Sequence, residues 1–111
     1  MSRKDDFFSS INAGYTCKGD FIVLGGAMLD GEAIADAHIK IPLKTLNRHG
    51  LIAGATGTGK TKTLQVISEQ LSLKGIPSLV MDVKGDLSGL ARPGQENDFI
   101  RERHEKINLP Y

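Results

Sequence analysis

The chain has 111 residues, 40% of them hydrophobic, which is enough for one small domain with a modest core and too little for two. Fourteen basic and 13 acidic residues leave a net charge of +1, so there is no electrostatic case for nucleic-acid or membrane binding across the whole surface. Cys17 is the single cysteine, which excludes an internal disulfide and fits an intracellular setting. With no apolar run of transmembrane length and no signal peptide, we expect a cytoplasmic protein without a membrane partner.

The first part of the sequence predicts short strands. Residues 1–14 are polar and are expected to be loose. Further on, Asp30–Gly31 separates two short apolar stretches, which indicates a two-residue hairpin turn. Residues 38–43 alternate polar and apolar side chains, as in a strand with one buried face. His38 falls on the polar face of that strand, and we therefore expect an ordinary exposed histidine rather than a metal ligand.

The middle of the chain changes to strand, loop, helix and strand. Residues 50–54 form a short continuous apolar run, as in a strand buried on both faces. After a glycine-rich loop, apolar residues between 64 and 71 recur at helical spacing, and Gly75 is expected to end this helix as a left-handed cap. Residues 79–83 are a second apolar run. This order predicts a βαβ unit with two parallel strands, and a charged helix is predicted over residues 95–106.

The loop has the spacing Gly54-x-x-x-x-Gly59-Lys60-Thr61, which is the Walker A pattern of phosphate-binding loops. Glycines let the backbone N–H groups curl round a β-phosphate, and a helix that begins there adds the positive end of its dipole. A plain glycine-rich turn does not explain a lysine at a helix start, where a cation is unfavourable unless an anion is bound.

Each loop residue therefore receives a predicted role. Lys60 is the candidate catalytic residue, because its charge would act on the β- and γ-phosphates. Thr61 is the candidate Mg²⁺ ligand, since Mg²⁺ prefers oxygen ligands. The predicted ATP contacts are Gly54, Ala55, Thr56, Gly57, Thr58, Gly59, Lys60, Thr61 and Lys62.

Asp82 ends the second apolar run and allows two interpretations. Ligands of open α/β sheets bind at the carboxyl ends of the strands, so Asp82 could hold Mg²⁺ through water, as a Walker B aspartate does. It could equally cap the turn that leads into Lys84, Gly85 and Asp86. The sequence leaves both open.

Two longer stretches carry a resemblance to a known family. "NRHGLIAGATGTGKTKTLQVISEQL", followed by "SLVMDVKGDLSGLA", resembles the HerA/FtsK-type DNA-pumping ATPases, and most of all the HerA-helicase-like family. The resemblance implies a P-loop α/β sheet in a ring-forming, usually hexameric, ATPase that uses ATP and Mg²⁺ and acts on double-stranded DNA. In that family the acidic Walker B pair normally follows a later strand, which would make Asp82 a relay residue rather than a direct Mg²⁺ ligand.

The resemblance covers about residues 41–95 and defines the expected fold class. We expect an α/β chain: a small N-terminal β-rich segment over residues 1–45, followed by a partial P-loop NTPase domain over residues 46–111. No apolar strand ends in Asp-Glu and no arginine finger is recognisable. The chain is therefore expected to be an N-terminal fragment of a longer protein and inactive alone.

Two other functions fit the same residues. One is a P-loop kinase or GTPase in which Asp82 is the true Walker B residue, although no guanine-reading Asn/Thr-Lys-x-Asp motif is present. The other is a non-catalytic module for nucleotide binding or oligomerisation.

Overall fold

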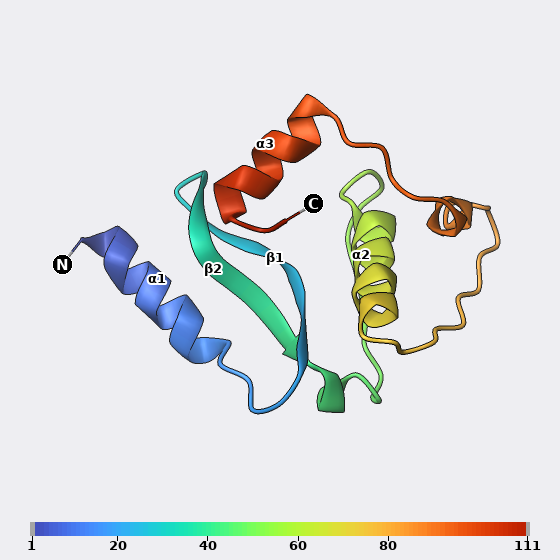
Figure 1. Cartoon of the computed structure of the whole chain (residues 1–111), viewed down its shortest axis with the longest axis horizontal. Coiled ribbons are helices and arrows are strands. Elements are labelled where there is room, and N and C mark those ends of the chain that lie inside the picture. Colours follow the sequence, from blue (N-terminus) through green and yellow to red (C-terminus); the bar gives the residue numbers. More distant parts are fainter. Residues whose placement is uncertain (1, 111) are drawn as a thin grey trace. The chain divides into compact units, whose positions relative to one another are not determined.

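The computed structural model describes residues 2–110 and contains one antiparallel hairpin, three α-helices and two short 3-10 helices within them (Figure 1). The elements are α1 (Arg3–Gly14), β1 (Phe21–Leu29), β2 (Glu32–Pro42), η1 (Leu43–Thr45), α2 (Lys60–Leu73), η2 (Ser88–Ala91) and α3 (Asp98–Ile107). They form two compact units. Among the described residues, the first unit holds 2–46 and 95–110, and the second holds 47–94.

The hairpin of the first unit confirms the predicted turn. Asp30 and Gly31 both have positive φ, 50° and 81°, which is the type I′ geometry that matches the twist of two antiparallel strands. Leu29 pairs with Glu32 directly across this turn. Farther along, Gly26 pairs with His38 and Met28 with Ala33, so β2 carries extra residues between these two pairs and bulges there.

The core of the first unit lies on this hairpin. Ala27, Ile34 and Ala37 are buried, and Phe7 and Ile11 of α1 pack against them. Phe7 and Ile11 are four residues apart and therefore share one face of the helix. The prediction of a loose segment over residues 1–14 is wrong, because this apolar pair ties the helix to the strands.

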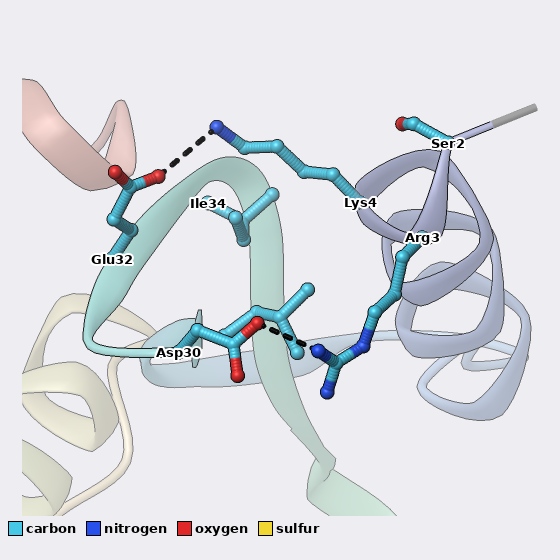
Figure 2. Close-up of a pocket in the computed structure, with 7 residues that line it drawn as sticks. Ser2, Arg3, Lys4, Asp30, Glu32 and Ile34 are labelled. Atoms are coloured by element: carbon cyan, nitrogen blue, oxygen red, sulfur yellow. Dashed lines mark hydrogen bonds and ion pairs between the residues drawn. The ribbon is translucent and has the colours of Figure 1, made fainter.

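Local signals also favour α1. Ser2 caps its N-terminus in a capping box, in which the Ser2 hydroxyl accepts from the Asp5 backbone N–H at 3.1 Å. Figure 2 shows the contacts that hold the start of the helix beside the hairpin turn: Arg3 pairs with Asp30 at 2.9 Å, and Lys4 pairs with Glu32 at 3.4 Å. These ion pairs are exposed, so each contributes little, about 0–1 kcal/mol.

The C-terminal helix belongs to the same unit and is joined to β2 by its last residues. Asn97 caps α3 at its start, and the helix begins three residues later than predicted. At its end, the His38 ring Nε2 donates to the Ile107 carbonyl at 2.8 Å, and the Asn108 amide donates to the Asp36 carboxylate at 2.6 Å. His38 is thus half-buried and structural, which corrects the expectation of an exposed histidine.

Because α3 approaches β1 closely at Gly26, a larger residue there is expected to destabilise the first unit. A Cβ at this position would lie 2.7 Å from the Ile107 Cβ and 2.5 Å from its Cγ2, so Gly26→Ala must displace the end of α3. We expect a loss of about 1–3 kcal/mol in the free energy of unfolding, the usual cost of overpacking. Urea unfolding followed by circular dichroism measures it.

The neighbouring glycine supplies the control for this substitution. A Cβ at Gly25 meets nothing within 4 Å, so Gly25→Ala should leave the unfolding midpoint unchanged or raise it slightly. Equal losses from the two substitutions would contradict the packing of Ile107 on Gly26.

In the second unit the helix is formed as predicted, but the flanking strands are not. α2 spans Lys60–Leu73, and Gly75 follows with φ +75°, its N–H donating to the Ser72 carbonyl at 2.9 Å. No strand is assigned to residues 50–54 or 79–83 within the part of the chain that the structure describes. A parallel pair is buried on both faces in the folds that contain it, whereas here Leu79 and Val83 are 94% and 102% exposed. The parallel βαβ unit therefore stays a prediction, which requires further strands or helices to cover these side chains.

The compact units group α3 with the hairpin. α3 lies within the predicted P-loop segment and packs on the hairpin. The predicted P-loop domain over residues 46–111 stays a prediction. Within residues 2–110, no helix is long and apolar enough to cross a membrane.

Candidate phosphate-binding site

The glycine-rich loop is held in shape by its own hydrogen bonds. The Lys60 ammonium donates to the carbonyls of Gly54 at 2.7 Å and Ala55 at 2.9 Å. The Thr58 hydroxyl donates to the same Ala55 carbonyl at 2.6 Å. A Cβ at Gly54 would lie 2.6 Å from that hydroxyl oxygen, so the loop closes on itself tightly at its first glycine. The side chain of Lys60 therefore reaches back across the whole loop.

Two of the loop glycines adopt backbone conformations that other residues avoid. Gly57 has φ +80° and Gly59 has φ +98°, both in the left-handed region. A Cβ at either position would meet no neighbouring atom within 4 Å, so the requirement for glycine is set by the backbone and not by space. This is the reason for the second and third glycines in the eight-residue loop.

The loop ends at a helix N-terminus that is prepared for an anion. α1 and α3 have side-chain caps from Ser2 and Asn97, and acidic residues in their first turns. α2 has Gly59 at its cap position, no side-chain cap and no acidic residue in its first turn. Its first N–H groups and the positive end of its dipole are therefore free of the usual acidic partners, although Lys60, Thr61 and Lys62 occupy that turn.

An open cavity of about 460 Å³ adjoins this helix start, and cations line it. Lys60 and Lys62 come from α2, and Lys84 comes from the segment after residue 83. The other lining residues are Thr56, Gly57, Gly59 and Thr61, so the lining carries three positive side chains and no carboxylate. Such a concentration of one charge favours a multiply charged anion.

A second hollow has a lining of mixed charge. It has a volume of about 380 Å³, lies beside the start of α1, and is the one drawn in Figure 2. Its two cations, Arg3 and Lys4, are already paired with Asp30 and Glu32. It therefore attracts an anion much less strongly than the cavity beside α2 does.

Asp82 does not line the cavity, and its carboxylate organises a turn. One oxygen, Oδ1, accepts from the backbone N–H groups of Lys84 at 3.1 Å and Gly85 at 2.9 Å. The other, Oδ2, accepts from the Leu87 N–H at 2.8 Å. The hydrogen bond from Leu87, followed by those from Gly85 and Lys84, lowers the pKa of Asp82 below its ordinary value of 3.8.

This pKa shift predicts how the turn responds to acid. Because the folded pKa is lowered, the ionised carboxylate stabilises the turn at any pH above the unfolded value, and the contribution is lost as the pH falls through the folded value. We expect the amides of Gly85 and Leu87 to keep their NMR chemical shifts from pH 7 down to the ordinary aspartate pKa of 3.8, and to move only below it, as Asp82 takes up a proton. In Asp82→Ala these amides should already be displaced at pH 7. If the Gly85 and Leu87 amides of Asp82→Ala titrated with the same midpoint as in the unaltered chain, their response to acid could not come from the Asp82 carboxylate.

The predicted ATP contacts fall into two groups in the structure. Thr56, Gly57, Gly59, Lys60, Thr61 and Lys62 line the cavity, whereas Gly54, Ala55 and Thr58 make the hydrogen bonds that close the loop. Their roles toward a nucleotide stay predictions. Across residues 2–110 no group of three or more His, Cys, Asp or Glu side chains could hold a metal ion, so a cation at this site would rely on Thr61 and on the nucleotide's own oxygens. Lys84 is the lining residue that sequence reasoning did not place here.

Comparison with known proteins bears on this arrangement. The family described as "Helicase HerA-like C-terminal" matches residues 28–111, which include the loop, α2 and the Asp82 turn. The chain belongs to the HerA-like helicase family.

Details of the match refine the prediction. The resemblance to HerA-type proteins is confirmed, but the matching description is that of the C-terminal region, which corrects the expectation of an N-terminal fragment. A curated relative is the DNA import protein CedB of Sulfolobus acidocaldarius, 38% identical over 68 residues. The aligned part covers 60% of this chain and 11% of CedB, so the chain spans a small part of that relative's length. No solved structure matches the HerA-like chain.

Proposed function

We propose that this HerA-like chain binds the phosphates of Mg·ATP with residues 54–62, as part of an ATPase that moves double-stranded DNA. The observation that carries the proposal is the cavity at the start of α2. A helix N-terminus without an acidic cap and three lysines without a lining carboxylate meet at one place, beside a Walker A loop.

The residues of the loop would have different roles in binding Mg·ATP. Backbone N–H groups from Gly57 to Thr61 would surround the β-phosphate. The Lys60 ammonium would exchange the carbonyls of Gly54 and Ala55 for oxygens of the β- and γ-phosphates. The Thr61 hydroxyl, one of the cavity-lining groups, would be the protein's ligand to Mg²⁺. When bound, Mg²⁺ would neutralise charge on the phosphates during their transfer.

The wider function rests on the family and on the relative. The family is named for helicases, and CedB is named as a DNA import protein, so duplex DNA is the partner that we propose for the protein to which this chain belongs. We further propose a ring of identical subunits in the cytoplasm, in which a neighbouring subunit supplies the arginine that the sequence of this chain does not identify.

The turn at Asp82 argues against the kinase or GTPase alternative. That alternative needs Asp82 as the Mg²⁺ residue, but both of its carboxylate oxygens already accept backbone N–H groups. The non-catalytic alternative is addressed by the measurement of turnover.

Phosphate release tests the proposed function. The sequence shows no strand ending in Asp-Glu, so we expect residues 1–111 alone to release no phosphate at a motor's rate, while the intact protein is stimulated by duplex DNA. Turnover by residues 1–111 that disappears in Thr61→Ala would favour the kinase or GTPase function. An intact protein that hydrolyses ATP but ignores DNA would contradict the motor, and one that binds ATP without any turnover would favour the non-catalytic module.

A further inference from the structure

We propose that Lys84 is a second phosphate-binding cation, which contacts the terminal phosphate of ATP from outside the Walker A loop. This inference rests on the proposed function and assigns a new residue to the same site. It starts from one observation: Lys84 lines the cavity beside α2 together with Lys60 and Lys62, although it comes from a different segment of the chain.

The backbone that carries Lys84 is fixed in two ways. The Asp82 carboxylate accepts from the N–H groups of Lys84, Gly85 and Leu87, which closes the turn on itself. The turn is also tied to α2, because the Gln65 side-chain amide donates to the Asp86 carbonyl at 3.1 Å. Gln65 lies little more than one turn along the helix that Lys60 begins. These hydrogen bonds therefore hold the backbone of Lys84 in a defined place beside the helix that carries the end of the phosphate loop.

The Lys84 side chain itself is available for a ligand. It is exposed, and among residues 2–110 its ammonium takes part in no ion pair. Three ammonium groups around one cavity repel each other, and a polyphosphate would relieve this repulsion. Two carboxylates lie two residues from Lys84 in the sequence, Asp82 and Asp86. Asp82 is turned toward backbone N–H groups, and neither of the two lines the cavity.

The place of Lys84 outside the loop decides which phosphate it contacts. The N–H groups of the loop and helix would enclose the β-phosphate, leaving little room there for a side chain from another segment. A lysine that approaches from the Asp82 turn meets the phosphate that projects beyond the loop. The γ-phosphate is that group in ATP, and ADP lacks it. Lys84 would therefore help the site to distinguish ATP from ADP.

The test compares the affinities of Lys84→Met for Mg·ATP and Mg·ADP with those of the unaltered chain. Methionine keeps the length of the side chain and removes its charge, and the position is exposed, so folding should be unaffected. We expect ATP binding to weaken about fivefold, as for one charged hydrogen bond near solvent, and ADP binding to change less than about twofold. Lys74→Met, at the far end of α2, is the control with the same loss of charge and should change neither affinity.

The outcomes separate this inference from the proposed function. If the unaltered chain binds no Mg·ATP, or binds it as well after Lys60→Ala, the proposed function fails. If Lys60→Ala weakens binding but Lys84→Met does not, the loop binds phosphate and the role of Lys84 is wrong. Equal weakening for ATP and ADP would also overturn the assignment to the terminal phosphate. Asp82→Ala adds a second arm: it should reproduce the selective loss for ATP, because the turn that positions Lys84 is then released.

Discussion

Lys60→Ala is expected to weaken the binding of Mg·ATP to this chain by about 10- to 150-fold, which corresponds to about 1.5–3 kcal/mol for hydrogen bonds to a charged group. The reason is the reach of this side chain. Its ammonium already spans the loop to the carbonyls of Gly54 and Ala55, so a small movement would bring it to the phosphates that the loop encloses. Alanine removes both the charge and the group that closes the loop.

Calorimetric titration with Mg·ATP measures this loss, and a matched control shows that charge alone does not explain it. Lys74 caps the C-terminal end of α2, about 20 Å along the helix from Lys60. Lys74→Ala removes the same charge from the chain and should leave the affinity within about twofold, because exposed charges farther apart than a Debye length are screened. Equal affinities for the unaltered chain and Lys60→Ala would remove the assigned role of the loop.

Thr61→Ala is expected to abolish most of the gain in ATP affinity that Mg²⁺ provides. Thr61 lines the cavity one residue after Lys60, and it is the hydroxyl in the first turn of α2 that the Walker A pattern assigns to Mg²⁺. With Mg²⁺ present we expect a loss of about 1–2 kcal/mol, roughly five- to thirtyfold, while the affinity without Mg²⁺ stays nearly unchanged.

Two further variants sharpen this prediction. Thr61→Ser keeps the hydroxyl and should restore the dependence on Mg²⁺, which excludes a general effect of altering the helix start. Asp82→Asn keeps one carboxamide oxygen as an acceptor for the turn and should leave the dependence on Mg²⁺ intact. If Asp82→Asn lost that dependence as Thr61→Ala does, Asp82 would be a Mg²⁺ residue and the kinase or GTPase function would gain.

Elements encoded by neighbouring residues were predictable from the sequence. The Asp30–Gly31 turn and the left-handed Gly75 after α2 follow from local backbone preferences, and both are present. The helix over residues 3–14 was missed, although Ser2 and Asp5 form its capping box and Phe7 and Ile11 share one face. Those signals are weak in a polar segment, and it is burial against the hairpin that makes them sufficient.

Features that depend on distant partners were not predictable in the same way. The apolar run over residues 79–83 is typical of a buried strand. Leu79, Met81 and Val83 are nevertheless exposed, because nothing in the described residues pairs with this segment. Lys84 joins the cavity because Asp82 and Gln65 fix the turn beside α2, and no spacing rule shows that. The docking of α3 on β2 likewise depends on His38 and Asn108, at positions far apart in the sequence.

Amide NMR of residues 1–111 titrated with Mg·ATP shows whether residues 54–62 bind the phosphates of ATP. We expect the largest chemical-shift changes at the amides of Gly57, Gly59, Lys60 and Thr61, a smaller change at Lys84, and little change in α1. The changes should be lost in Lys60→Ala at the same nucleotide concentration. Chemical-shift changes confined to residues outside the loop, or an unchanged loop at saturating nucleotide, would contradict phosphate binding by residues 54–62.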